Sequence, residues 1–230
     1  MNDMTRPDAT DPPYLYPGYR STTLRAPKQP LVQLPAGALD VPFATVGTAF
    51  VKEGDNDLTV HGKAGAPLGE RMILTGRLID ESGRPVRRSL VEIWQANASG
   101  RYHHVGDQHD APLDPNFHGL GRTMTDGEGR YRFMTIKPGS YPWPNHANAW
   151  RPQHIHFSLL GNAPVQRLVT QMYFPGDPLL ALDPIYQSIP AGARERLLCR
   201  LDLDAGVENY ALGYQFDIVL AGAKSTPLGI

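Results

Sequence analysis

The stretch RMILTGRLIDESGRPVRRSLVEIWQA, residues 71–96, decides the fold class. Its two ends are rich in apolar and β-branched residues, and the turn sequence ESGRP lies between them. The second end alternates, so that Val91 and Ile93 point to one face and the residues between them to the other. We therefore predict two strands, and the glycine and proline of the turn favour a hairpin between them.

Further strand patterns follow along the chain. The 23 glycines and 22 prolines suit a chain of short strands and turns, and they are rarely tolerated in helical bundles. Short helices are predicted near Asp177–Asp183 and Ala191–Leu198. The sequence thus predicts an all-β fold, a β-sandwich with long loops and short helices. The additional strand candidates are RYRFMTI at 130–136, HIHFSLL at 154–160, RLVTQMYF at 167–174 and YQFDIVLAG at 214–222.

The first 68 residues differ from the rest of the chain in composition. They are rich in proline, which breaks helices and central strands, and we predict an extended N-terminal arm over residues 1–68. Residues 69–230 are predicted to form the sandwich domain. The arm also carries Tyr14, Tyr16 and Tyr19, which need a surface to pack on. We expect the arm to lie on its own domain or on a partner subunit.

Charge and cysteine content exclude several classes of function. The formal net charge is -1, so neither a nucleic acid nor an anionic membrane is expected as a partner. No apolar run approaches the roughly 20 residues of a membrane helix. Cys199 is the single cysteine, so no disulfide forms within the chain, and no secretory signal is visible at the N-terminus. A cytoplasmic location is expected.

A metal site is suggested by the motif His154-Ile155-His156. Residues i and i+2 of a strand point to the same face, so the two imidazoles are able to bind one ion. By itself the motif is also typical of two ordinary histidines. Its context adds Tyr102 and Tyr141 in the two long loops and Arg151 just before the strand. The zinc patterns of paired cysteines or H-E-x-x-H are absent from the sequence.

The stretch from Leu74 to Tyr102, LTGRLIDESGRPVRRSLVEIWQANASGRY, resembles the signature of the intradiol ring-cleavage dioxygenases. The shared pattern is L-x-G-x-L, then Gly83, Val86, the triplet Val91-Glu92-Ile93, and G-x-Y ending at Tyr102. Other blocks resemble the protocatechuate-cleaving members in particular, and the resemblance covers nearly the whole chain. They are GYRSTTLRAPKQPLV, DPNFHGLGRTMTD, TIKPGSYPWPN, NAWRPQHIHF, TQMYFPGDPL and FDIVLAG.

The resemblance implies a role for each matching residue. Arg151 is expected beside the metal as a catalytic residue, and Tyr141 is expected to be both ligand and catalytic base. The substrate pocket is expected to contain Tyr19, Trp143, Gln171 and Ile185. The expected ligands of a non-haem Fe(III) ion are Tyr102, Tyr141, His154 and His156.

The donor types suit that ion. Ferric iron is hard and favours anionic oxygen donors, with imidazole as borderline support. A bound cation makes phenols bind as tyrosinates, although their ordinary pKa is near 10. Two tyrosinates cancel two of the three iron charges. The family then implies that a catechol-type diol displaces Tyr141, which takes up one of its protons, and that O2 opens the ring between the oxygen-bearing carbons.

Several alternatives stay open at this point. A catechol or hydroxyquinol substrate is the first, although the proline-rich arm favours protocatechuate. A non-catalytic, transthyretin-like binding module is the second. The resemblance also implies a homologous α chain as partner in an αβ hetero-oligomer. Five further histidines crowd the long loops, as metal neighbours or as ordinary loop residues: His103, His104, His109, His118 and His146.

Overall fold

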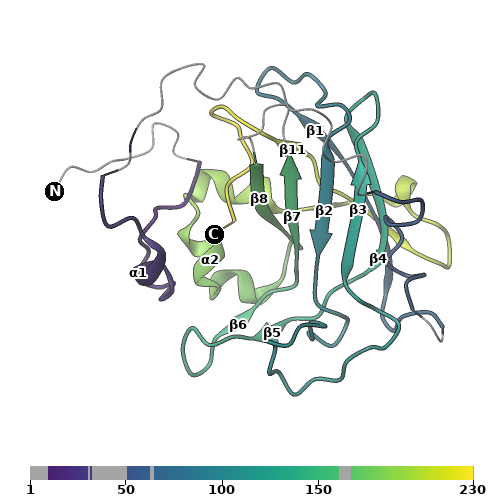
Figure 1. Cartoon of the computed structure of the whole chain (residues 1–230), viewed down its shortest axis with the longest axis horizontal. Helices are drawn as coiled ribbons and strands as arrows, with labels where there is room; N and C mark the ends of the chain where they lie inside the picture. Colours follow the sequence, from purple (N-terminus) through teal and green to yellow (C-terminus); the bar gives the residue numbers. More distant parts are fainter. Residues whose placement is uncertain (1–9, 31, 33–50, 63–64, 161–166, 230) are drawn as a thin grey trace.

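The computed structural model describes residues 10–30, 32, 51–62, 65–160 and 167–229. The described strands form two main sheets that face one another (Figure 1). In the first sheet β1 (Arg71–Ile79) runs antiparallel to β4 (Arg130–Ile136) on one side, and parallel to β10 (Leu212–Gln215) and β11 (Ile218–Val219) on the other. Strand β9 (Arg200–Leu201) pairs with β10.

The second sheet is antiparallel throughout. Its order is β3 (Leu120–Met124), β2 (Leu90–Trp94), β7 (His154–Leu160) and β8 (Arg167–Tyr173). Alternate residues of both sheets are buried between them, as the period of two requires. The all-β sandwich predicted from the sequence is therefore confirmed. The core contains Met72, Leu74, Leu78, Val91, Ile93, Phe133, Ile155, Phe157 and Leu159.

The predicted hairpin between β1 and β2 is wrong, because these strands lie in different sheets. The turn itself forms: Asp80 Oδ1 accepts hydrogen bonds from the amides of Ser82 and Arg84, and Gly83 has a φ of 79°. Beyond it the chain crosses to the second sheet, where Leu90 pairs with Met124 of β3. A turn sequence indicates where the chain reverses, and it does not choose the sheet that the next strand joins.

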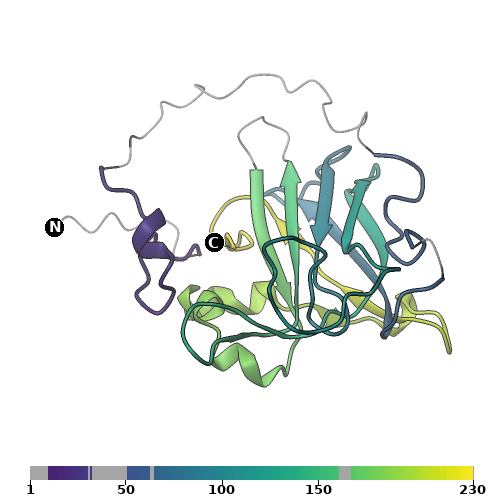
Figure 2. The same cartoon turned by 60° about the horizontal axis from the view of Figure 1, so that its bottom comes forward.

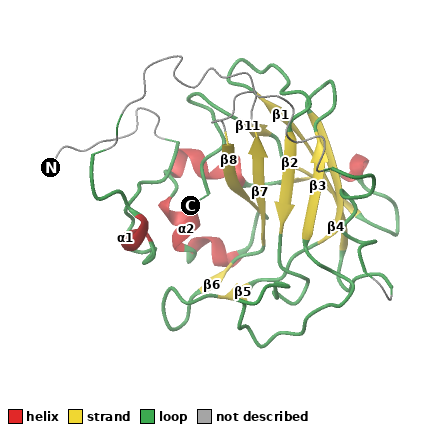
Figure 3. Cartoon of the chain, viewed as in Figure 1, coloured by secondary structure: helices red, strands yellow, loops and turns green. Residues whose placement is uncertain are grey.

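The helices that follow the edge strand β8 directly in the sequence lie beside it, as the red group around α2 in Figure 3 shows. They are η2 (Pro178–Ala181), α2 (Pro184–Ser188) and η3 (Ala191–Leu197), and a short η4 (Leu203–Ala205) follows β9. Both predicted helical segments are confirmed as 3-10 turns, whereas α2 between them was not predicted. Asp177 and Asp183 cap η2 and α2, and each is followed by a proline at the first helical position.

Residues 10–30 of the arm pack on their own chain. Thr10 and Asp11 contact the C-terminal segment, and Asp11 Oδ1 accepts from the amide of Leu228 at 2.9 Å. Helix α1 (Thr22–Arg25), purple in Figure 2, lies outside the sandwich near the helices that follow β8. Leu58, which falls within the predicted arm, is fully buried in the core of the sandwich. Residues 33–50 lie outside the described residues, so the boundary at residue 68 stays a prediction. In the described part of the chain, no helix has the length and apolarity needed to cross a membrane.

Candidate metal centre and active-site pocket

Strand β7 places two imidazoles on the outer face of the second sheet. Ile155 and Phe157 point into the core, so His154 and His156 point to the opposite face. The neighbouring strand β2 supplies Trp94, which lies directly opposite His156. The two rings stack with centroids 4.8 Å apart and an interplanar angle of 1°. This stacking fixes the orientation of the His156 ring.

Tyr102 comes from the long loop before β3, and a tight turn aims it at the histidines. Asn97 Oδ1 accepts a hydrogen bond from the amide of Arg101 at 2.9 Å. Gly100 has a φ of 80°, and a Cβ added there would lie 2.1 Å from the carbonyl oxygen of Ser140. Only glycine fits this position. The glycine of the G-x-Y pattern therefore lets the Tyr102 loop lie against the loop that carries Tyr141.

Tyr141 and Arg151 are held opposite each other by a two-stranded ribbon. The strands are β5 (Tyr141–Pro142) and β6 (Trp150–Arg151), and the two residues are partners in the antiparallel register. Figure 1 shows this ribbon at the end of β7 where the histidines begin. The 137–152 segment, predicted to be one of the two long loops, thus contains a short pairing that aligns two of the predicted site residues.

The donor atoms of these side chains converge. The Tyr141 hydroxyl lies 3.1 Å from His154 Nε2, which lies 3.2 Å from His156 Nε2. The Tyr102 ring stands perpendicular to that of Tyr141, with centroids 5.3 Å apart. His154 Nδ1 lies 2.7 Å from the carbonyl oxygen of Pro152, which assigns the proton to Nδ1 and leaves the lone pair on Nε2. The structure thus brings together all four predicted ligands.

This donor set fits a ferric ion. In the described part of the chain, no group of three or more His, Cys, Asp and Glu side chains is placed to hold a metal. The cluster combines two phenol oxygens with two imidazole nitrogens, which suits hard Fe(III) better than Zn²⁺. The buried hydroxyl of Tyr102 has no hydrogen-bond partner among the described residues. A buried polar atom of this kind is costly unless a ligand or ion satisfies it.

Burial and one neighbouring charge set the protonation of the four groups. Burial raises the pKa of Tyr102 well above its ordinary value and also raises that of Tyr141, so both phenols are neutral without a cation. Burial, reinforced by the charge of Arg151, lowers the pKa of His154 and brings that of His156 to about 3. Both imidazoles are therefore neutral at physiological pH, which is the form that binds metal.

Arg151 is itself buried, and its guanidinium is held on two sides. Nε lies 3.2 Å from a carboxylate oxygen of Asp183. Nη2 donates to Gln171 Oε1 and, at 3.1 Å, to the hydroxyl of Tyr173. The Tyr173 hydroxyl donates in turn to Gln171 Oε1 at 2.9 Å. Arg151 also lies 5.6 Å from the centre of the ring of Trp143, one of the predicted pocket residues.

A cavity of about 1020 Å³ opens beside the cluster. Tyr102, Tyr141 and Trp143 line it, together with Trp94 of β2. The indole N–H of Trp143 is buried without a hydrogen-bond partner among the described residues. The cavity thus offers aromatic walls and unpaired polar atoms, the usual composition of a site for a small aromatic ligand.

The other predicted pocket residues, unlike Trp143, do not line the cavity itself. Tyr19 of the arm packs edge-on against Trp143, with ring centroids 5.3 Å apart, so it lies at the border of the cavity. Gln171 and Ile185 are buried, with 3% and 4% of their surface exposed, and do not line the cavity. Gln171 Oε1 accepts a hydrogen bond from Arg151, and the amide of Ile185 donates to Asp183 Oδ1. Their predicted contact with substrate stays a prediction.

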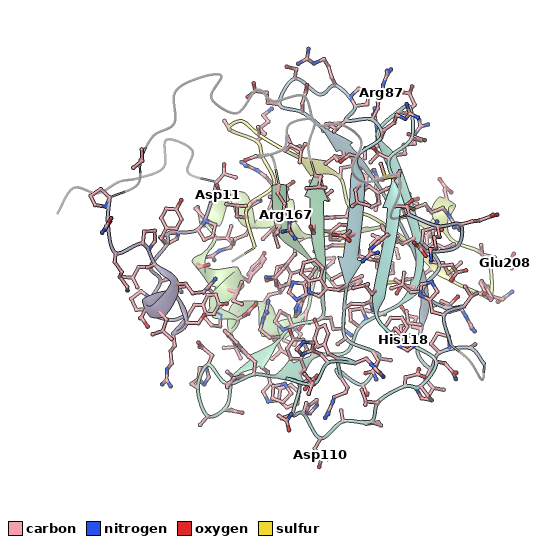
Figure 4. The ribbon with its side chains drawn as sticks, in the orientation of Figure 1. Asp11, Arg87, Asp110, His118, Arg167 and Glu208 are labelled. Atoms are coloured by element: carbon pink, nitrogen blue, oxygen red, sulfur yellow. The ribbon has the colours of Figure 1, made fainter. Side chains whose placement is uncertain are left out.

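The five loop histidines all line the same cavity: His103, His104, His109, His118 and His146. The rings of His103 and His118 pack edge to face at 5.1 Å, and His109 packs against Trp150 at 5.9 Å. Figure 4 labels His118 and Asp110 on the loops at this end of the sandwich. These five histidines therefore form part of the pocket wall.

Two residues of this site escaped the sequence reasoning. Asp183 and Tyr173 hold Arg151, yet they lie 32 and 22 residues away from it in the sequence. The dipeptide Asp183-Pro184 is a signal for a helix start, which explains the cap but not the ion pair.

Comparison with known proteins agrees with this geometry. A family model described as dioxygenase matches residues 46–222, and a model described as protocatechuate 3,4-dioxygenase beta subunit N terminal matches residues 4–36. The chain belongs to this dioxygenase family.

Individual relatives place the chain within the family. It is 59% identical over 218 residues to the protocatechuate 3,4-dioxygenase beta chain of Burkholderia cepacia, a match that covers 94% of this chain and 93% of that one. The protocatechuate 3,4-dioxygenase alpha chain of Pseudomonas putida is 30% identical over 193 residues, which are 80% of this chain and 90% of that one.

A solved structure also matches the fold. The catechol 1,2-dioxygenase of Pseudomonas arvilla C-1 superposes with a TM-score of 0.54 at 26% identity. That match covers 74% of this chain and 57% of the other, so the chain spans little more than half of that enzyme.

Proposed function

We propose that this chain is the iron-bearing subunit of an intradiol dioxygenase that opens the ring of protocatechuate, 3,4-dihydroxybenzoate, with O2 to give 3-carboxy-cis,cis-muconate. One observation carries the proposal: two half-buried phenols and two neutral imidazoles, of which His154 is buried and His156 half-buried, converge beside an aromatic-walled cavity. The high identity to a protocatechuate 3,4-dioxygenase beta chain supports the choice of substrate.

The proposed iron ligands are Tyr102, Tyr141, His154 and His156. When bound, ferric iron supplies Lewis acidity toward the two hydroxyl oxygens of the diol and renders the ring reactive toward O2. The protein residues hold and move the protons. Tyr141 Oη, on the short ribbon at the mouth of the cavity, takes up one substrate proton when the diol binds. His154 stays in place because its Nδ1–H is tied to a backbone carbonyl.

Arg151 acts on the charge of the bound substrate. Its guanidinium cannot lose its proton, and it is fixed from two sides within the buried region beside the ligands. A fixed positive charge in a water-poor site stabilises negative charge that develops on a substrate oxygen. Trp143 and Tyr19 form the aromatic border against which the substrate ring packs.

We also propose an α chain as partner. The support is the 30% identity to an alpha chain, which indicates that related chains of both kinds share one ancestry. Co-expression with a homologous chain of similar size tests this: we expect the two to co-purify in equal amounts.

Colour and substrate use test the proposed activity. The iron-loaded protein should be red-brown, because tyrosinate-to-iron(III) charge transfer absorbs visible light. Oxygen uptake should be fastest with protocatechuate in a panel that includes catechol and hydroxyquinol. A preference for another diol would correct the substrate. A chain that stays colourless after iron loading would instead favour a binding module without catalysis.

A further inference from the structure

Asp183 is the buried anion nearest to Arg151. Its side chain is completely buried, and both carboxylate oxygens face the guanidinium: Oδ1 lies 3.2 Å and Oδ2 3.3 Å from Arg151 Nε. The same carboxylate accepts from the amides of Ile185 and Tyr186 at the start of α2, at 3.3 and 3.4 Å. An ionised carboxylate only accepts hydrogen bonds, so it matches this set of donors.

The other edge of the guanidinium is held by uncharged groups. Nη2 donates to Gln171 and to Tyr173, and Tyr173 lies within 3.5 Å of the Asp183 carboxylate as well. Nε and Nη2 are thus engaged, and no hydrogen bond from Nη1 to a described residue is found. Nη1 is the nitrogen that remains for a substrate oxygen.

This geometry separates two functions of the network. The proposed iron ligands are on β7, β5 and the loop before β3, whereas Asp183 is the cap of α2. Strand β6 has only two residues, and the long side chain of Arg151 has many rotamers. Neither the backbone nor the side chain alone therefore fixes the position of the guanidinium. A charge partner on a separate element is what gives the guanidinium a single position.

We propose that Asp183, together with Tyr173, is a positioning residue that holds the guanidinium of Arg151 so that Nη1 faces the bound substrate. The inference rests on the proposed function and deepens it. Asp183 does not itself touch substrate or iron. It holds the guanidinium of Arg151 in one position, and it connects that position to the start of α2.

The test uses the iron-loaded full-length chain together with its partner chain. Asp183→Asn retains one oxygen for the helix cap and removes the charge that holds Arg151. We expect kcat to fall about tenfold or more with KM changed by less than about threefold, since the lost interaction acts mainly on the transition state. Iron content and the tyrosinate absorption band should stay near those of the unmodified protein, which separates this result from failure of the proposed metal site.

Asp177→Asn is the matched control. Asp177 also caps a short helix before a proline, and it accepts from the amide of Gln153 without touching Arg151. We expect its kcat to stay within about twofold of the unmodified protein. An equal loss in both variants would overturn the proposal, because a cap alone would then explain the effect.

A double variant checks that Asp183 acts through Arg151. In an Arg151→Ala background, Asp183→Asn should change kcat by less than about twofold, because the group to be positioned is gone. A full loss on that background would overturn the proposal.

If Asp183→Asn fails to fold, Tyr173→Phe tests the proposal instead, because it keeps the ring and removes the hydroxyl that contacts Arg151. We expect its kcat to fall about threefold or more at normal iron content, and an unchanged kcat would overturn the proposal.

Discussion

The charge of Arg151 shifts the pKa values of all four proposed ligands toward the protonation states that coordinate a metal. Burial is the largest effect on each group, and it raises the pKa of the two phenols and lowers the pKa of the two imidazoles. The guanidinium then lowers the pKa of all four. Deprotonated phenols and neutral imidazoles are the forms that coordinate a cation. The charge of Arg151 thus favours the protonation states in which these four groups coordinate a cation.

Tyr141→Phe tests the role of one ligand. The variant loses the hydroxyl that lies 3.1 Å from His154 Nε2 and keeps the ring that packs on Tyr102. We expect the visible absorption band to weaken and shift, and kcat to fall about tenfold or more, because one tyrosinate and one proton acceptor are removed. Visible spectra and oxygen uptake measure both.

Tyr131→Phe provides the comparison for that variant. Tyr131 is buried, and its hydroxyl donates to the carbonyl of Phe216 in the sandwich core. We expect a loss of about 1 kcal/mol in the free energy of unfolding and no change in colour. Identical spectra for Tyr141→Phe and the unmodified protein would exclude Tyr141 as a ligand.

At the scale of elements, one side chain connects the arm to the ribbon of β5 and β6. Asn145 is buried between them. Its Oδ1 accepts from the amide of Arg20 at 2.9 Å, and its Nδ2 donates to the carbonyl of Gly18 at 2.8 Å. These two hydrogen bonds hold the backbone on either side of Tyr19, whose ring packs edge-on against that of Trp143. The arm therefore reaches the pocket border by a specific attachment.

Asn145→Ala should release this attachment. We expect KM for the diol to rise about fivefold or more with kcat and colour nearly unchanged, because substrate packing is lost but the ligands stay in place. Asn56→Ala, which removes a side chain that likewise donates to a backbone carbonyl (that of Arg132, at 3.0 Å) but does not line this cavity, should leave KM within about twofold. Steady-state kinetics measure both. Equal KM values for the two variants would show that the arm does not form the pocket border.

The local parts of this architecture were predictable from sequence. The alternation in 154–160 depends only on a period of two, so the strand and the shared face of His154 and His156 were predicted correctly. The G-x-Y pattern could be read as a resemblance, while its physical reason, the close approach of Gly100 to the neighbouring loop, needed the structure.

Pairings between distant segments were not predictable in the same way. The hairpin prediction failed because β1 pairs instead with β4, β10 and β11, which come later in the chain. Strand β3 was missed because LGRTM alternates weakly and its burial depends on contact with β2. The pair of Arg151 and Asp183 joins a ribbon to a helix cap 32 residues away, and no local pattern encodes that contact.

At the scale of the whole molecule, Cys199 reports on the integrity of the sandwich. It is the only cysteine of the chain, it is 2% exposed, and it belongs to the main core cluster. Its amide donates to the carbonyl of Tyr173 at 2.9 Å, so it is attached to the edge strand β8, next to the strand that carries His154 and His156. A reagent reaches this thiol only when the core opens.

We therefore expect the native chain to react very slowly with a thiol reagent at about pH 8, and rapidly once denaturant unfolds it. Burial raises the pKa of the Cys199 thiol from 9.0 to about 12, so the folded chain keeps this proton in the interval where the unfolded chain releases it. The unfolded state then binds fewer protons, and this group's contribution to stability falls as pH rises from about 9 to 12.

Iron loading should slow the labelling of Cys199 further, because an ion that binds only the folded state lowers the population of open forms. Cys199→Ala supplies the blank, and labelling of the iron-loaded chain as fast as in denaturant would contradict this account of the core.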